Sequence, residues 1–186
     1  PGAVVGNGLQ TNGVLIDDEL ARLLAEYHFL VGVSVDGPPE IHNVFRLKAN
    51  GQGSYDDVMR GIGHLCEQRV DFNILTLVSD SNVRHPQRVY EFLCDQDFLF
   101  HQYIPCVEVD ERLALLPFAI QPEAWGEFLC GIFDAWYPED TRRVSVRLFD
   151  SILALLVDGV RNICRYGRNC CQYFVVEHNG DIFPCD

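Results

Sequence analysis

Hydrophobic residues gather in four short runs that are separated by segments of helical periodicity. The runs contain few charges and cover Val4–Thr11, Phe29–Val35, Phe72–Ser79 and Phe98–Val107. Near-continuous apolar runs of this length are typical of parallel strands that are covered on both faces of a sheet. The pattern therefore predicts four buried parallel strands.

The segments between the runs carry apolar residues at helical spacing. Asp17 is a candidate N-cap for the first helix, Ser54 begins the second and His85-Pro86 opens the third. Their predicted apolar stripes are Leu20, Leu23, Leu24 and Tyr27; Val58, Met59, Ile62 and Leu65; and Val89, Phe92 and Leu93. The alternation predicts right-handed βαβ units in an α/β fold. Four parallel strands do not close a barrel, so an open sheet with two helical layers and a piece of a (β/α) barrel both fit.

The pattern changes after the fourth run. Gln121-Pro122 opens an amphipathic helix, and Phe149–Val157 predicts another. A hairpin is expected last, with Tyr173–Glu177 and Asp181–Phe183 as strands, because Asn-Gly between two β-rich runs is a strong hairpin signal. The apolar stripe of the first of these helices is Trp125, Phe128, Leu129, Ile132, Phe133 and Trp136. A boundary near residue 160 would divide the chain into residues 1–160 and 161–186.

Composition narrows the class of protein. Hydrophobic residues make up 48% and charged residues 22% of the 186, which excludes wholesale disorder. The formal net charge of −13 opposes binding to nucleic acid or an anionic membrane. The longest apolar runs are too short to span a membrane, and the N-terminus lacks the pattern of a signal peptide. Because the sequence does not begin with Met, we expect a piece of a longer protein.

Polar residues end each predicted strand, where parallel α/β sheets bind ligands. They include Gln10, Thr11 and Asn12 at the end of the first strand, Ser34 and Asp36 at the end of the second, with Arg46 shortly beyond, Ser79 at the end of the third and Gln102 in the fourth. These groups suit a polar ligand with a ribose and an amino-acid portion. The alternative is that Asn12-Gly13 and Asp36-Gly37-Pro38 are simply turns.

The eight cysteines fall into two groups. Cys66, Cys94, Cys106 and Cys130 are scattered in apolar stretches and are expected to be small buried residues. Cys164, Cys170, Cys171 and Cys185 crowd the last stretch. A hairpin can return Cys185 toward Cys170, and three thiolates at one point suit an iron–sulfur cluster or zinc, whereas a disulfide is the alternative.

Five blocks together resemble the anaerobic sulfatase-maturating enzymes. They are LQTNG at 9–13, VGVSVDGPPEIHNVFR at 31–46, FNILTLVS at 72–79, FHQYIPCVE at 100–108 and the cysteine segment at 164–186 that ends in EHNGDIFPCD. These are radical S-adenosylmethionine (SAM) enzymes with a SPASM-type auxiliary-cluster domain, also described as arylsulfatase regulators. The resemblance covers essentially the whole chain. It implies the C-terminal part of a partial (β/α)6 barrel, followed by the start of the cysteine-rich domain.

The resemblance also implies site residues and partners. Gln10, Ser34 and Arg46 align with SAM contacts, and Leu77 with a residue that lines the adenosine. Cys164, Cys170 and Cys185 align with three ligands of an auxiliary 4Fe–4S cluster, and Asp186 with the general base. The implied reaction oxidises a Cys or Ser of a sulfatase polypeptide to Cα-formylglycine, with an external electron donor, in the cytoplasm.

Two family segments are missing from this sequence. They are the C-x3-C-x2-C loop that binds the SAM-cleaving cluster and the GGEP-type segment after it. We therefore expect a fragment that is inactive alone. Two other functions stay open: a radical SAM maturase of another ribosomal peptide, and a non-catalytic regulatory module.

Overall fold

A parallel sheet of consecutive strands organises residues 6–146. The computed structural model describes residues 6–164, 167 and 174–184. The strands are β1 (Asn7–Thr11), β2 (Phe29–Ser34), β3 (Phe72–Val78), β4 (Phe100–Pro105) and β5 (Ser145–Val146), and they pair in the order β1-β2-β3-β4-β5. The four predicted strands are confirmed with shorter bounds, although Val4 and Val5 lie outside the described residues. The two-residue strand β5 was not predicted.

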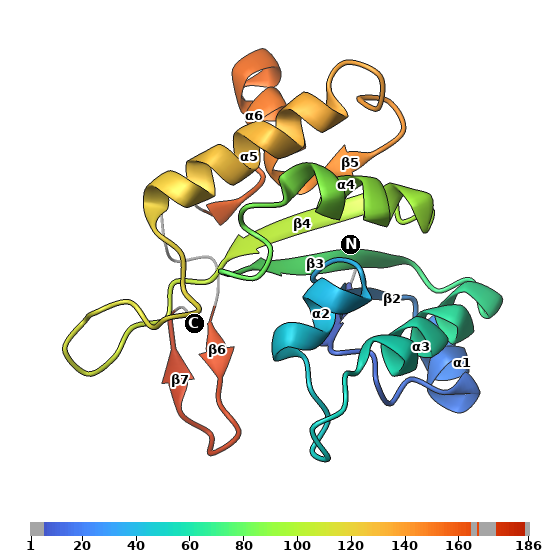
Figure 1. Cartoon of the computed structure of the whole chain (residues 1–186). Helices are drawn as coiled ribbons and strands as arrows, with labels where there is room; N and C mark the ends of the chain where they lie inside the picture. Colours follow the sequence, from blue (N-terminus) through green and yellow to red (C-terminus); the bar gives the residue numbers. More distant parts are fainter. Residues whose placement is uncertain (1–5, 165–166, 168–173, 185–186) are drawn as a thin grey trace. The chain divides into compact units, whose positions relative to one another are not determined.

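Helices connect the strands in the predicted alternation (Figure 1). They are α1 (Asp18–Glu26), α2 (Pro39–Phe45), α3 (Tyr55–Glu67), α4 (Pro86–Asp95) and α5 (Pro122–Trp136). The short helix α2 was not predicted, because Pro38-Pro39 reads as a turn. In an all-parallel sheet of sequential order, right-handed crossovers place every connecting helix on the same face. This order favours the barrel-type winding over an open sheet with two helical layers.

One face of the sheet carries the core. Val31, Val33 and Val35 of the β2 segment are fully buried, and Ile74 and Val78 of β3 join them. On the opposite face, Leu30 is 54% exposed and Phe100 is 59% exposed. The expectation that the strands are covered on both faces therefore holds in the middle of the sheet, where Gly32 and Leu75 are buried, and fails at Leu30 and Phe100. The helices supply the other half of the core through residues including Leu24, Val58, Ile62, Leu65, Val89, Leu93, Phe128 and Ile132.

The predicted helices are confirmed in position, whereas the residues predicted to be buried on them are only partly correct. Asp17 caps α1 as expected, since its Oδ1 accepts a hydrogen bond from Leu20 N at 2.9 Å. The α1 stripe is wrong at two positions: Ala21 and Leu24 are buried, whereas Leu23 and Tyr27 are exposed. Of the four scattered cysteines only Cys106 is buried, and Cys66 and Cys130 are exposed, because they fall on the outer faces of α3 and α5.

Residues 147–186 form a separate unit. It contains α6 (Arg147–Asp158), as predicted, and an antiparallel hairpin of β6 (Val175–Val176) and β7 (Ile182–Phe183). Gly180 turns the hairpin with φ of +89°, and its N–H donates to the carbonyl of Glu177 at 2.9 Å. The Asn179-Gly180 hairpin prediction is thus confirmed. The expected boundary near residue 160 stays a prediction.

Candidate functional site

Three of the predicted ligand contacts share one face of the sheet. In the parallel register, Gln10 lies level with Gly32, Ser34 with Leu75, and Leu77 with Ile104. Because alternate residues of a strand share a face, Gln10, Ser34 and Leu77 point to the same side at successive levels toward the carboxyl ends. Among the described residues, the side chains of Gln10 and Ser34 have no hydrogen-bond partner. Both remain available to a ligand.

A cleft of about 650 Å³ opens at the carboxyl ends of β1, β2 and β3. It brings Arg46 and Leu77 together, but Gln10 and Ser34 do not line it. Its other lining residues are Asn12, Val14, Leu15, Asp36, Phe45, Leu47, Lys48, Ala49 and Ser54. Apolar walls with a few polar groups are typical of a small-molecule site.

Arg46 forms a bidentate ion pair with Asp36. Its Nε donates to Asp36 Oδ2 at 2.7 Å, and its Nη2 donates to Oδ1 at 3.1 Å. The same Oδ1 accepts from the backbone N–H of Leu77 at 3.0 Å. A guanidinium has five N–H donors, so three remain unused, two of them on Nη1. Arg46 can therefore contact Asp36 and a ligand at the same time.

His42 and Ser54 extend this pair into the interior. The N–H of Asp36 donates to His42 Nδ1 at 3.3 Å, so the proton of the neutral ring lies on Nε2. Nε2 then donates to Ser54 Oγ at 3.1 Å, and Ser54 Oγ donates to the carbonyl of Arg46 at 2.9 Å. Burial lowers the pKa of His42 to about 4, which keeps its ring neutral at physiological pH.

Neither His42 nor Ser54 was predicted as a site residue. Ser54 was expected to begin a helix, and it does occupy the N-cap position of α3, but its hydroxyl makes no cap bond. Instead Asn43 Oδ1 accepts from the first helical N–H, that of Tyr55, at 3.1 Å. The sequence signal for His42 is weak: it stands four residues before Arg46, and Arg46 follows the last residue of α2.

Other polar residues at this rim serve the backbone. Asn12 Oδ1 accepts from Val14 N at 3.2 Å, and Gly13 has φ of +76°, so the turn interpretation is correct there. Asn82 Nδ2 donates to the carbonyls of Asp36 and Leu77 at 3.0 and 2.9 Å. This amide fixes the carboxyl ends of the β2 and β3 segments to each other.

Lys48 brings a second cation to the cleft, but its charge is already paired. Its Nζ lies 2.9 Å from Asp57 Oδ2, and Arg60 Nη1 lies 2.8 Å from Asp57 Oδ1. These two cations hold the pKa of Asp57 below its usual value. The cleft therefore presents balanced charges, Arg46 with Asp36 and Lys48 with Asp57, rather than a strong field of one sign.

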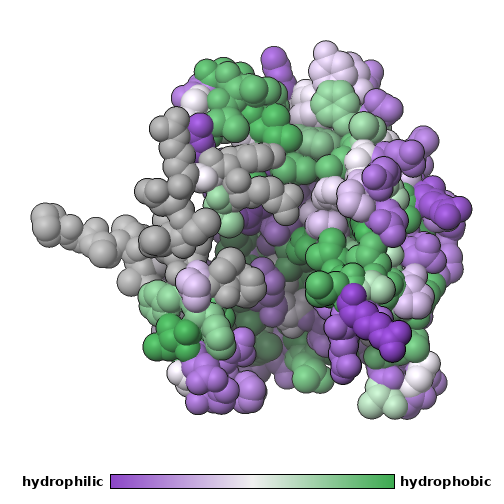
Figure 2. All heavy atoms as spheres, turned by 90° about the vertical axis from the view of Figure 1, so that its left-hand side faces the viewer, coloured by the Kyte–Doolittle hydropathy of each residue, from purple (hydrophilic) through white to green (hydrophobic). Residues whose placement is uncertain are grey.

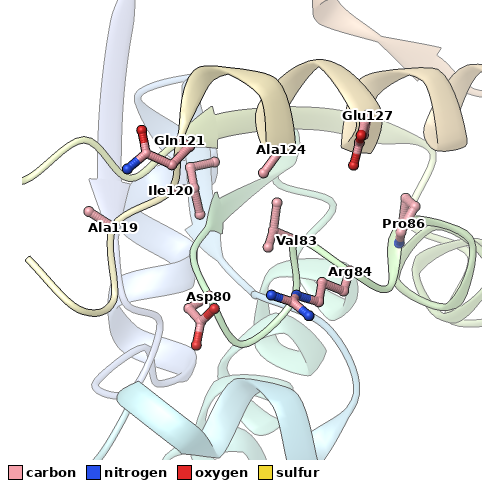
Figure 3. Close-up of a pocket in the computed structure, with 9 residues that line it drawn as sticks. All are labelled: Asp80, Val83, Arg84, Pro86, Ala119, Ile120, Gln121, Ala124 and Glu127. Carbon is pink, nitrogen blue, oxygen red and sulfur yellow. The ribbon is translucent and has the colours of Figure 1, made fainter. Parts of the chain in front are cut away.

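A second hollow of about 560 Å³ lies between the β3–α4 loop and the first half of α5 (Figure 3). It exposes the charged side chains of Asp80, Arg84 and Glu127 over Val83 and Ile120. It contains none of the predicted site residues.

Figure 2 looks at the chain from the side to which β3 and β4 point, and shows apolar surface in several patches with hydrophilic residues between them.

The predicted cluster ligands are mostly outside the described residues. Cys164 is described and is an exposed, free thiol. Cys170, Cys185 and Asp186 lie outside the described residues, so their predicted roles stay predictions. Within residues 6–164, 167 and 174–184, no group of three His, Cys, Asp or Glu side chains forms a metal site. In the same part of the chain, no helix is both long and apolar enough to cross a membrane.

Comparisons with known proteins agree on one family. Residues 2–93 match the model of the Radical SAM superfamily. The chain is 38% identical over 181 residues to the cysteine-type anaerobic sulfatase-maturating enzyme of Clostridium novyi (strain NT), covering 96% of this chain and 48% of the relative. It is 36% identical over 200 residues to the serine-type enzyme of Bacteroides thetaiotaomicron, covering 100% and 48%.

A solved structure gives the same result. Native anSMEcpe with bound AdoMet and Cp18Cys peptide superposes with a TM-score of 0.86 at 38% identity, covering 97% of this chain and 51% of that one. The chain thus spans about half the length of the relatives it matches. The fold expectation of an α/β radical SAM architecture is confirmed.

Proposed function

Since the chain belongs to the family of anaerobic sulfatase-maturating enzymes within the radical SAM superfamily, we propose that it forms part of the SAM site of such an enzyme. The reaction we propose is the oxidation of a Cys or Ser in a sulfatase to Cα-formylglycine. The observation that carries this proposal is 36–38% identity to both Cys- and Ser-type enzymes along nearly the whole chain.

The cleft fits the proposed cofactor in size and charge. Its volume of about 650 Å³ lies within the usual range of ligand sites, about 300–1,000 Å³. The unused N–H groups of Arg46 suit the carboxylate of an amino-acid moiety, and Leu77 offers an apolar surface to a nucleoside. Ser34 and Gln10 offer further hydrogen bonds from the same face of the sheet. When bound, SAM supplies the radical that removes a hydrogen atom from the peptide.

The remaining roles rest on the family alignment. Oxidation at Cβ must also release a proton, and we assign its acceptor to Asp186. Cys164, Cys170 and Cys185 are the proposed ligands of an auxiliary 4Fe–4S cluster, whose remaining ligand the sequence does not identify. The proposed partners are a sulfatase polypeptide and an electron donor, and the proposed compartment is the cytoplasm.

The activity is tested with the longest protein that contains this chain. After anaerobic reconstitution with iron and sulfide, it is incubated with SAM, a reductant and sulfatase peptides that carry Cys or Ser at the target position. Mass spectrometry should detect the aldehyde product in at least one peptide. Cleavage of SAM without aldehyde in either peptide would contradict the proposed substrate.

The cofactor site is tested by a pair of arginine variants. Arg46→Lys keeps the charge but loses the two-pronged geometry, so we expect the Kd for SAM to rise about 10-fold or more. Arg22→Lys is the matched control, because Arg22 is an exposed arginine that also pairs with a carboxylate, that of Asp18, and neither residue lines the cleft. Equal affinities of the two variants would refute the assignment of Arg46.

The proposed base is tested separately. Asp186→Asn should lower aldehyde formation by about two to four orders of magnitude while SAM cleavage persists, because only the proton acceptor is lost. Asp181→Asn in the exposed hairpin is the control. Near-normal aldehyde formation by Asp186→Asn would place the base elsewhere.

A further inference from the structure

We propose that His42 and Ser54 are positioning residues, which fix the direction in which Arg46 presents its unused N–H groups to the cleft. They do so through a closed ring of hydrogen bonds formed by Asp36, His42, Ser54 and Arg46, which we call the Arg46 ring. The inference rests on the proposed function for the identity of the ligand, but the ring itself is a property of the folded chain.

The ring closes on Arg46 from both ends. The side chain of Arg46 is bound to the carboxylate of Asp36, and the carbonyl of Arg46 accepts from Ser54 Oγ. His42 spans the gap, since its two ring nitrogens contact Asp36 N and Ser54 Oγ. The direction of every bond is determined, because a neutral imidazole has one donor and one acceptor. No rotation of the Arg46 side chain leaves the ring intact.

The distribution of bonds argues against a purely structural role. A serine at an N-cap normally binds the helix N–H groups, yet Asn43 performs that task for α3. The carbonyl of Arg46 already accepts from the backbone N–H of Ser54 at 3.0 Å. The hydroxyl of Ser54 is therefore not required to join these two segments. Its additional bond connects His42, and through it Asp36, to the backbone of Arg46.

Burial allows this arrangement to work as a rigid support. His42 is fully buried and Asp36 nearly so, whereas Arg46 is partly exposed at the edge of the cleft. In the Arg46 ring, His42 and Asp36 are therefore shielded from water, and Arg46 is the residue that reaches the cleft. An arginine fixed before binding loses less side-chain entropy when the ligand arrives. We expect the ring to improve ligand affinity up to about 10-fold.

The first test observes Arg46 without any ligand. NMR measures hydrogen exchange at the Arg46 Nε–H in the wild-type chain and in Ser54→Ala, which keeps the backbone bond and loses only the hydroxyl. Thr76→Val is the matched control, because Thr76 Oγ1 is also buried and also donates to a backbone carbonyl, that of Val35 at 2.7 Å. We expect about 10-fold faster exchange in Ser54→Ala and no change in Thr76→Val.

A second variant covers the case in which Ser54→Ala unfolds. His42→Asn can place an amide oxygen near the position of Nδ1, so it keeps an acceptor for Asp36 N–H but loses the bond to Ser54. It should show the same acceleration of exchange at Arg46. If Arg46 Nε–H stays equally protected in the folded variants, or accelerates as much in Thr76→Val, the inference is overturned.

The second test measures the Kd for SAM in the longest protein that contains this chain. Ser54→Ala should weaken binding up to about 10-fold in the wild-type background, and have no further effect once Arg46 is replaced by Met. An equal loss in both backgrounds would show that Ser54 does not act through Arg46. Absence of SAM binding by the wild type would refute the proposed function, while the exchange experiment would still decide on the ring.

Discussion

Two histidines of this chain are equally buried but are bonded to different kinds of partners. His42 belongs to the Arg46 ring at the carboxyl ends of β2 and β3. His101 belongs to β4 and faces Tyr90 of α4. Its Nε2 donates to the carbonyl of Phe98 at 2.7 Å and its Nδ1 accepts from Tyr103 OH at 3.1 Å. Burial lowers the pKa of both to about 4, and both carry their proton on Nε2.

The difference lies in what their partners do. His101 is surrounded edge-to-face by the rings of Tyr90 and Tyr103, with centroids 5.6 and 5.9 Å away. Tyr90 in turn donates to Asp140, which Arg143 also binds. The ring contact between Tyr90 and His101 packs α4 against β4. The hydrogen bonds of this group, which we call the His101 cluster, stay within the framework: they fix His101 to its own strand segment and α4 to the loop that contains Asp140. The bonds of the Arg46 ring end instead on a side chain at a cleft. Desolvation alone therefore does not identify a functional histidine; its connections do.

The largest expected effect is a loss of stability when His101 is replaced, which would distinguish the His101 cluster from the Arg46 ring. His101→Ala removes a buried ring and leaves Tyr103 OH and the Phe98 carbonyl without their partner, so we expect a loss of about 3 kcal/mol in the free energy of unfolding. Urea denaturation measures it, with the exposed His85→Ala as control. The affinity for SAM should not change. A stability loss below about 1 kcal/mol, or weaker SAM binding, would break the distinction between the two sites.

Both buried histidines should lower the free energy of unfolding at acidic pH. Their pKa is lowered in the folded chain, so the unfolded chain binds more protons between pH 6.5 and 4. The free energy of unfolding should thus be unaffected by them above pH 6.5 and fall by on the order of 2 kcal/mol for each histidine as the pH drops toward 4.5.

Charged neighbours act on the pKa of each ring in opposite directions. Asp36 and Arg46 act in opposite directions on His42, as do Asp140 and Arg143 on His101, and burial is the largest cause at both. Urea midpoints between pH 7 and 4.5 test the prediction. His101→Phe should remove part of the pH dependence and the remainder belongs to His42. A stability that is constant or rises toward pH 4.5 is incompatible with this account.

The smallest expected effect is a gain in stability from replacing two residues of positive φ, one before β3 and one before β4, and it should be equal at the two positions. Arg69, before β3, and Asp97, before β4, have φ of +56° and +59°, which favours glycine. Arg69→Gly and Asp97→Gly should each stabilise the chain by about 0.5 kcal/mol. Arg69→Ala is the control, since it removes the side chain without relieving the backbone. Unequal gains would indicate that the two halves of the sheet differ at the amino ends of their strands as well.

The sequence predicted the fold through its strongest patterns and missed its weakest. The apolar runs and the cap at Asp17 gave four strands and α1, whereas β5 has only two residues and α2 begins within Pro38-Pro39. Of the site, Arg46 and Leu77 were expected and line one cleft. His42 and Ser54 could not be found this way, because burial and hydrogen-bond direction depend on contacts between distant segments, and hydrophobic periodicity does not report them.

The most direct test of the central claim is a crystal structure of the longest protein containing this chain, grown with SAM. We expect SAM in the cleft between Arg46 and Leu77, with a carboxylate oxygen within hydrogen-bonding distance of Arg46 Nη1 and with Asp36 still bound to Arg46 Nε. SAM in the hollow lined by Asp80, Arg84 and Glu127, or SAM without contact to Arg46, would contradict the account.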